Sequence, residues 1–335
     1  MTSAAIYGCT GLTLTTEERA FFRDADPLGF ILFARNCDTP DQIRALCADL
    51  RDSVGRSEAP ILIDQEGGRV QRLRPPHWRS APPAGMFAAL ARRDARAGVE
   101  ALRLNALLIA HELKALTIDV DCWPLADVPQ SDADPIIGDR AFGRDVSGVA
   151  RLARIACDGL LAGGVLPVIK HVPGHGRARA DSHKELPRVD ASLQDLRSVD
   201  FEPFRQLADM PIAMTAHVVY NAVDAQRCAT VSPTVITDVI RGWIGFSGFL
   251  VSDDLSMKAL EGDFAARAKN ALAAGCDAVL HCNGEMPEMT AVATGVRALD
   301  AAGTDRWQWA RAKLTSSADF DRTAAETRLR ELMTA

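Results

Sequence analysis

Eight short apolar runs alternate with longer stretches of helical spacing along this chain of 335 residues, and that alternation limits the folds it can adopt. The runs are apolar nearly throughout, which is typical of strands buried on both faces of a parallel sheet. We expect strands at residues 4–9, 29–34, 60–64, 118–128, 165–171, 211–219, 248–253 and 277–282. Between them, helices are expected at residues 40–54, 99–116, 149–162, 193–207, 233–243, 264–274 and 286–299. Thr39 and Ser232 each precede a proline, a combination that favours the start of a helix.

The order of strands and helices predicts an α/β fold, a closed (β/α)8 barrel of the TIM type, whose usual size is about 250 to 400 residues. An open doubly wound sheet is the alternative, but the first strand is not followed by the GxGxxG turn of a dinucleotide site. The sequence has no linker or low-complexity segment, so residues 1–335 are expected to form a single domain. From about Thr304 onward we expect a helical C-terminal extension that packs outside the barrel.

Charge and cysteine content argue against several classes of function. The chain has 38 Lys and Arg against 44 Asp and Glu, a net charge of −6, and no basic stripe that would favour nucleic acid or an anionic membrane. It has no uninterrupted apolar window of about 18 residues, and its N-terminus lacks the pattern of a secretion signal. The eight cysteines are scattered without a CxxC pair, as expected of free thiols in a reducing compartment. We therefore expect a cytoplasmic protein.

Titratable residues collect where five consecutive predicted strands end, from the third to the seventh. In barrels of this type the active site lies at the carboxyl ends of the strands, so these side chains should meet at one face. A barrel held together only by packing would not need them. The segments are residues 64–72, 137–140, 170–183, 215–217 and 252–255.

Each segment also has a purely structural interpretation. Asp64 and Glu66 could be a solvated strand end, and the arginines at 72 and 140 could form surface ion pairs. One of the two consecutive aspartates could cap the next helix, since aspartate favours helix starts. That role fits Asp254 better than Asp253, because Asp253 is still on the strand. Lys170 and His217 could simply be hydrogen-bonded inside the barrel, and for His217 neither interpretation prevails.

The segment from residue 170 to residue 183 allows two kinds of chemistry. His171, His175 and His183 could be metal ligands, although Pro173 and the glycines beside it break any helix that would align the first two. Alternatively, Asp181 and His183 are two residues apart in an extended loop and can point the same way. A carboxylate bonded to one imidazole nitrogen raises the basicity of the other, and such a pair can act as a general acid and base.

Four of these motifs together resemble the family 3 glycoside hydrolases. They are DQEGGRVQR at residues 64–72, KHVPGHG at 170–176, DSH at 181–183 and SDDLSM at 252–257. They are most similar to the single-domain bacterial β-N-acetylglucosaminidases of peptidoglycan recycling, and the resemblance runs from about residue 6 to residue 300. It implies a (β/α)8 barrel, in agreement with the strand pattern.

The resemblance also implies roles for individual residues. Asp253 corresponds to the family's nucleophile, His183 to its acid/base and Asp181 to the partner of that histidine. The family holds the sugar hydroxyls with an aspartate, two arginines and a Lys-His pair, which correspond here to Asp64, Arg72, Arg140, Lys170 and His171. No role follows for His175 or His217.

Two departures from the family pattern leave these roles untouched. Val172 stands where phenylalanine is common, and Asp134 precedes Pro135 where asparagine is frequent. Two-domain relatives take their acid from a second domain; this chain ends too early for one, so we expect the histidine loop to supply it.

The resemblance implies a monomeric, retaining exo-acting hydrolase that needs no metal or cofactor. It would act on small carbohydrates such as muropeptides, and bind neither nucleic acid nor membrane. Three alternatives stay open: a metal-dependent hydrolase on the same barrel, phosphorolysis in place of hydrolysis, and a sugar-binding protein without turnover.

Overall fold

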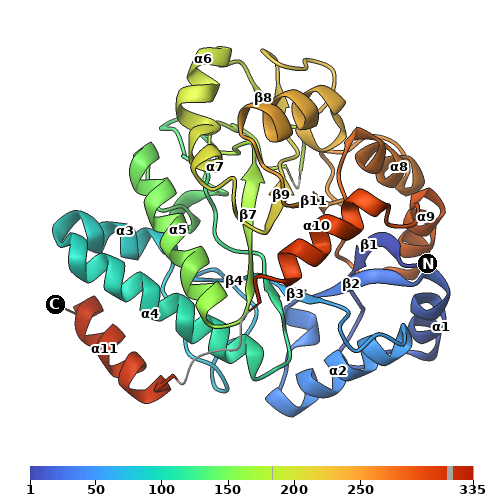
Figure 1. Ribbon diagram of the computed structural model, residues 1–335, viewed down its shortest axis with the longest axis horizontal. Coiled ribbons are helices and arrows are strands. Elements are labelled where there is room, and N and C mark those ends of the chain that lie inside the picture. Colours follow the sequence, from blue (N-terminus) through green and yellow to red (C-terminus); the bar gives the residue numbers. More distant parts are fainter. Residues whose placement is uncertain (183, 315–319, 335) are drawn as a thin grey trace.

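Eight parallel strands form a closed barrel in the computed structural model, which describes residues 1–182, 184–314 and 320–334 (Figure 1). Around the barrel the order of strands is β1-β12-β11-β9-β7-β6-β3-β2, with Ala5 of β1 opposite Val279 of β12 closing the ring. This confirms the (β/α)8 fold. The barrel strands are β1 (Ser3–Tyr7), β2 (Pro27–Leu32), β3 (Ile61–Ile63), β6 (Val120–Asp121), β7 (Leu166–Val172), β9 (Ile212–Thr215), β11 (Phe249–Asp254) and β12 (Ala278–His281).

Helices surround the barrel and follow the strands along the chain. They are α1 (Thr16–Ala25), α2 (Pro40–Ser53), α3 (Ala84–Arg93), α4 (Ala95–Lys114), α5 (Val146–Ala162), α6 (Leu193–Asp195), α7 (Glu202–Gln206), the π-helix η5 (Val235–Trp243), α8 (Phe264–Ala274), α9 (Met286–Gly295), α10 (Ala301–Arg311) and α11 (Arg322–Thr334). Among the described residues, no helix is both long enough and apolar enough to cross a membrane.

The two expected helix starts are confirmed by side-chain caps. The Thr39 hydroxyl accepts a hydrogen bond from the amide of Gln42 (3.3 Å), and Ser232 accepts one from the amide of Val235 (3.1 Å). Helix α1, in contrast, lies outside the ranges expected from the sequence. Most of its ten residues are polar and Phe22 is the one apolar residue among them that is buried, so the helix carries little apolar signal, although Thr15 closes a capping box at its start.

The fourth strand is much shorter than the expected range of residues 118–128. Only Val120 and Asp121 pair with the neighbouring strands in the regular ladder, although backbone hydrogen bonds to β3 and β7 continue between Cys122 and Ala126. Pro124 explains the difference, because proline has no N–H to donate to a ladder. A single bridge between Leu125 and Lys170 follows.

Apolar side chains fill the barrel interior and α10 closes its amino-terminal end. Trp307 of α10 contacts the ring of Phe249 at the start of β11, with 5.4 Å between ring centroids. Figure 1 shows α10 crossing in front of the strands, while α11 lies against α4. The opposite, carboxyl end of the barrel carries two small sheets, the hairpin of β4 (Gln65–Gly67) with β5 (Val70–Gln71) and the parallel pair of β8 (Arg188–Val189) with β10 (Val219–Tyr220).

Candidate active site

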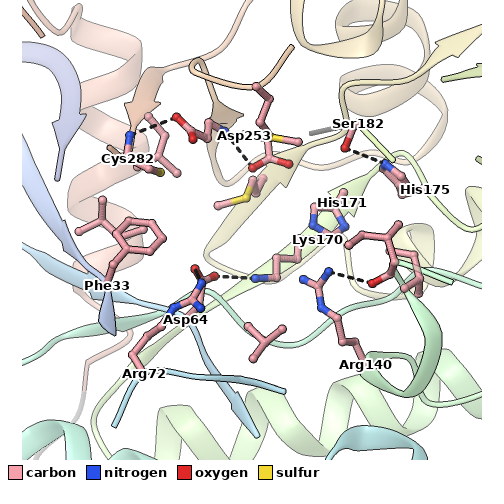
Figure 2. A pocket seen from close by; sticks show the side chains of 18 of the residues that line it. Phe33, Asp64, Arg72, Arg140, Lys170, His171, His175, Ser182, Asp253 and Cys282 are labelled. Carbon is pink, nitrogen blue, oxygen red and sulfur yellow. Dashed lines mark hydrogen bonds and ion pairs between the residues drawn. The ribbon is translucent and has the colours of Figure 1, made fainter. Parts of the chain in front are cut away.

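A polar pocket of about 250 Å³ opens at the carboxyl ends of the barrel strands (Figure 2). Six of the eight residues that the sequence singles out line it, namely Asp64, Arg72, Arg140, Lys170, His171 and Asp253. Met214, Met257 and Phe33 contribute apolar surface to the same pocket. Asp181 does not line it, and His183 lies outside the described residues.

Asp64 and Arg72 are brought together by the β4–β5 hairpin, which begins directly after β3. Gly67 and Gly68 have φ angles of +93° and +58°, and a Cβ at Gly67 would lie 2.4 Å from the carbonyl oxygen of Pro82. Only glycine suits that turn. The hairpin returns the chain so that the Arg72 guanidinium contacts the Asp64 carboxylate at 2.9 Å.

Lys170 joins both acidic residues of the first motif. Its Nζ lies 2.8 Å from Asp64 and 2.7 Å from Glu66, and the side chain is buried. Burial alone would lower the pKa of Lys170, but the two carboxylates outweigh it and raise that pKa. Burial alone would raise the pKa of Asp64, and there Lys170 and Arg72 outweigh it, so this carboxyl is ionised at neutral pH.

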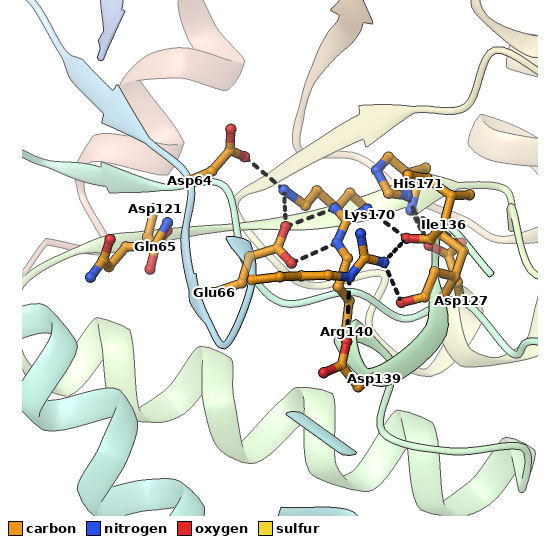
Figure 3. A network of polar contacts seen from close by, with 12 residues as sticks. Asp64, Gln65, Glu66, Asp121, Asp127, Ile136, Asp139, Arg140, Lys170 and His171 are labelled. Carbon is orange, nitrogen blue, oxygen red and sulfur yellow. Dashed lines mark hydrogen bonds and ion pairs between the residues drawn. The ribbon is translucent and has the colours of Figure 1, made fainter. Parts of the chain in front are cut away.

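Glu66 is a buried residue that holds other side chains in place, whereas the sequence suggested only a strand end. Its two carboxylate oxygens accept hydrogen bonds from Nε and Nη2 of Arg140, both at 2.8 Å (Figure 3). Burial would raise the pKa of Glu66, but Arg140 and Lys170 prevail and lower it to about 2. Glu66 does not line the pocket, so it acts by fixing two cationic side chains that do.

Asp127 is a second buried residue of this kind, and no motif pointed to it. Its carboxylate lies 2.8 Å from Nδ1 of His171 and accepts the backbone N–H of His175 at 2.6 Å. A carboxylate beside Nδ1 keeps a proton on that nitrogen and leaves Nε2 for a ligand. The available signal was an aspartate within residues 122–128, a stretch otherwise composed of apolar residues and proline.

Asp253 is the penultimate residue of β11 and its carboxylate lies in the pocket (Figure 2). One oxygen accepts the backbone N–H of Asp254 at 2.8 Å. Burial would raise the pKa of Asp253, but His171, His217 and that backbone bond outweigh it, and the pKa is lowered. The pocket therefore contains an ionised carboxylate able to attack an electrophilic carbon.

Asp254 does not cap the next helix, so that structural expectation is wrong. Its carboxylate accepts the backbone N–H of Ser256 (3.0 Å) and of Cys282 (3.1 Å) instead, joining the ends of β11 and β12. The cap of α8 is Asp263, whose carboxylate accepts the amide of Ala266 at 2.8 Å. Several loop residues separate β11 from α8, so a strand-end aspartate cannot reach the helix.

His217 is hydrogen-bonded inside the barrel wall and does not line the pocket. Its Nδ1 lies 2.7 Å from the Thr230 hydroxyl and its Nε2 lies 3.0 Å from the carbonyl oxygen of Asp254. Both ring nitrogens are therefore engaged by protein groups, which supports the structural interpretation.

His175 lines the pocket and contacts the segment that carries the predicted acid/base. Burial lowers its pKa to about 4, so the ring is neutral near pH 7. Its Nε2 lies 3.3 Å from the hydroxyl of Ser182, which also lines the pocket. The backbone carbonyl oxygen of Asp181, the preceding residue, accepts the backbone N–H of Lys184 at 2.8 Å. Ser182, which lies between Asp181 and His183 in the sequence, thus reaches the pocket.

A metal centre finds little support among the residues that the structure describes, which include no group of three or more His, Cys, Asp or Glu side chains arranged to hold an ion. In the proposed histidine set, Nε2 of His175 already lies 3.3 Å from the Ser182 hydroxyl, whereas the Asp127 contact of His171 engages only Nδ1. The third, His183, is outside the described part of the chain.

Comparison with known proteins agrees with the motifs. The model of the glycosyl hydrolase family 3 N-terminal domain matches residues 11–306. A β-hexosaminidase of Alkalilimnicola ehrlichii is 41% identical over 280 residues, which cover 82% of this chain and 79% of that protein.

Two solved structures are also similar. NagZ from Neisseria gonorrhoeae, in complex with N-trifluoroacetyl-D-glucosamine, has a TM-score of 0.89 and 32% identity, covering 100% of this chain and 98% of that one. A family 3 β-N-acetylglucosaminidase from Paenibacillus has a TM-score of 0.84 and 29% identity, covering 98% of this chain and 67% of that one.

Proposed function

This chain belongs to glycosyl hydrolase family 3 and is a glycoside hydrolase, and we propose that it is a retaining exo-β-N-acetylglucosaminidase. One observation carries the proposal: the Asp253 carboxylate shares a pocket with the charged cluster of Asp64, Arg72 and Lys170. An anionic nucleophile beside fixed donors and acceptors for hydroxyl groups is what cleavage of a glycoside requires.

In the proposed mechanism, Asp253 attacks the anomeric carbon of the bound sugar. The bond to the leaving oxygen breaks while His183 donates a proton to that oxygen, and a covalent glycosyl-aspartate forms. His183, now neutral, then takes a proton from water, whose oxygen displaces Asp253 and releases the sugar with retained configuration. Asp181 would hold the imidazole in the orientation that both steps need.

The proposed substrate is a terminal β-linked N-acetylglucosamine. Support comes from the Neisseria relative, which was solved with an N-acylated glucosamine. The sugar hydroxyls would be bound by Asp64, Arg72, Arg140, Lys170 and His171, all of which line the pocket. The broader proposal is a monomeric cytoplasmic enzyme of cell-wall recycling acting on N-acetylglucosaminyl-1,6-anhydro-N-acetylmuramic acid and its peptide forms.

Asp253→Asn tests the nucleophile, because asparagine keeps the shape of the side chain and removes its charge. Release of p-nitrophenol from p-nitrophenyl N-acetyl-β-glucosaminide should fall by roughly 1,000-fold or more. Asp132→Asn is the matched control, since Asp132 is exposed and pairs with the exposed Arg179, and its rate should stay near normal. A near-normal rate in Asp253→Asn would remove this residue from the mechanism.

His183→Ala tests the acid role through the leaving group. A p-nitrophenyl group leaves without much help, whereas an alkyl or sugar alcohol needs a proton, so the variant should slow the second class far more. Equal slowing of both classes would argue against acid catalysis by His183.

The competing functions give different products or requirements. A p-nitrophenyl β-glucoside should be cleaved much more slowly than its N-acetylglucosamine counterpart, and comparable rates would contradict the proposed substrate. Formation of a sugar phosphate in phosphate buffer would indicate phosphorolysis. Loss of activity on dialysis against EDTA, restored by zinc, would favour the metal-dependent alternative.

A further inference from the structure

A second and larger cavity, of about 630 Å³, lies beside the candidate active site between α8 and the segment that precedes η5. We propose that this cavity, here called the arginine groove, binds the carboxylate-bearing chain attached to the leaving sugar. Its lining combines the side chains of Arg188, Arg227 and Arg267 with the apolar side chains of Leu186, Val231 and Leu260. The proposal rests on the proposed function and extends it to the aglycone, the part of the substrate that departs.

The position of the groove relates it to the leaving group. The loop that carries the predicted acid/base places Ser182 in the active-site pocket and Leu186 in the groove. The loop after β11 does the same with Met257 and Leu260. The two loops are joined by a hydrogen bond from the backbone N–H of Ala259 to the carbonyl oxygen of Ser182 (3.2 Å). The pocket and the groove thus flank the same pair of loops, one of which carries the predicted acid/base.

The arginines of the groove lack the carboxylate partners that most arginines of this chain have. Within the part of the chain that the structure describes, none of the three forms an ion pair. Arg267 donates to the carbonyl oxygens of Leu255 (2.8 Å) and Gly262 (3.0 Å), and Arg188 donates to that of Ala225 (3.0 Å). Backbone carbonyls orient a guanidinium group but do not neutralise it.

The balance of charge in the groove is opposite to that of the whole chain. Three arginines face a single acidic residue, Glu261, in a chain whose net charge is −6. Guanidinium groups that form no ion pair can bind carboxylates through charge-assisted hydrogen bonds. The apolar side chains between them would contact methyl and methylene groups. This combination fits a short acidic peptide better than an inorganic anion, which would gain nothing from the apolar surface.

Three β-N-acetylglucosaminides that differ only in the aglycone would test the groove. The first has a p-nitrophenyl aglycone, the second an aglycone carrying an alanyl-glutamate dipeptide, and the third the same dipeptide with both carboxylates amidated. In Arg188→Glu/Arg227→Glu, kcat/KM should fall about tenfold for the acidic peptide, because two favourable contacts become repulsive. It should change less than about twofold for the two uncharged substrates, since their contacts with the sugar pocket are unaffected. In the wild type, raising the salt concentration should narrow the difference in kcat/KM between the acidic peptide substrate and the two uncharged substrates.

Arg93→Glu/Arg330→Glu is the matched control, because it changes the net charge by the same amount at exposed positions on α3 and α11. It should leave all three substrates within about twofold of the wild type. Arg188→Gln/Arg227→Gln removes charge without creating repulsion, and we expect a smaller loss that is again confined to the acidic peptide.

Equal losses for the acidic and amidated peptides, or no loss for either, would overturn the groove as an anion site. Failure of the wild type to cleave the p-nitrophenyl substrate would instead contradict the proposed function. In that case calorimetry with the alanyl-glutamate dipeptide alone decides on the groove. Binding that disappears in Arg188→Glu/Arg227→Glu supports it, whereas no binding, or equal affinity for inorganic phosphate, overturns it.

Discussion

Asp127 engages two pocket histidines from a fully buried position, holding the ring of His171 and the backbone of His175. A buried carboxylate of this kind determines which imidazole nitrogen faces a ligand. Glu66 has the same relation to Arg140 and Lys170. At the scale of single residues, the side chains that would contact the sugar are therefore oriented by acids that do not line the pocket.

Asp127→Asn should lower kcat/KM by about 10- to 100-fold while leaving the fold intact. Asp127 uses one carboxylate oxygen for the ring of His171 and the other for the backbone N–H of His175. Asparagine replaces one of these oxygens with an NH2 group, which cannot accept a hydrogen bond. Steady-state kinetics on p-nitrophenyl N-acetyl-β-glucosaminide would measure the loss, and we expect KM to rise because His171 is assigned to binding. The control is Asp132→Asn, at an exposed aspartate paired with Arg179. Kinetics within twofold of the wild type would show that Asp127 does not position His171.

The β4–β5 hairpin, strand β7 and the short helix η2 (Gly138–Arg140) are separate elements that meet at one carboxylate. Glu66 comes from the hairpin, Lys170 from β7 and Arg140 from η2. All three side chains are largely buried, so each charge is stabilised by the other two and not by water. At the scale of elements, this cluster fixes the relative positions of three loops around the pocket.

Glu66→Gln should destabilise the protein by about 3 kcal/mol, because it leaves two buried cations with one fewer counter-charge. Urea denaturation monitored by tryptophan fluorescence would measure the change. Asp139→Asn also removes an acid from an arginine pair in this region, but both partners are about half exposed, so it should cost less than about 1 kcal/mol.

The loss of stability caused by Glu66→Gln should depend on pH. The pKa of Glu66 is lowered by folding from its ordinary value near 4.5 to about 2, so its contribution to stability is fully present above pH 4.5. That contribution disappears as the pH falls through the folded-state value. The stability difference between wild type and variant should therefore shrink between about pH 5 and pH 2. A difference that stays constant over that range would show that charge is not its origin.

At the scale of the whole molecule, the candidate active site and the helix that closes the barrel lie at opposite ends of the barrel. The pocket lies at the carboxyl ends of the strands, and α10 covers their amino-terminal ends with Trp307 packed on Phe249. Ala310 joins the same interior cluster. Changes at the closed end should therefore affect stability without altering the chemistry of the pocket.

Trp307→Ala should cost about 3 kcal/mol, since it opens a cavity at the end of the barrel core. Trp309→Ala is a matched control on the same helix, because Trp309 is 38% exposed, and it should cost less than about 1 kcal/mol. Chemical denaturation gives both values, and kcat on p-nitrophenyl N-acetyl-β-glucosaminide should be unchanged at temperatures where the variants are folded. A large loss of kcat in folded Trp307→Ala would contradict the separation of the two ends.

By itself, the sequence determined the barrel and the face on which the site lies. Strand and helix periodicities are local properties, and parallel strands in a barrel bring their carboxyl ends to one face, so residues as distant as Asp64 and Asp253 could be assigned to one pocket. Only the tertiary structure decided which charges are paired. Asp127 meets His171 across 44 residues, and Glu66 meets Arg140 across 74. Such pairs form because folding removes both groups from water together, and no local pattern records which groups are desolvated side by side.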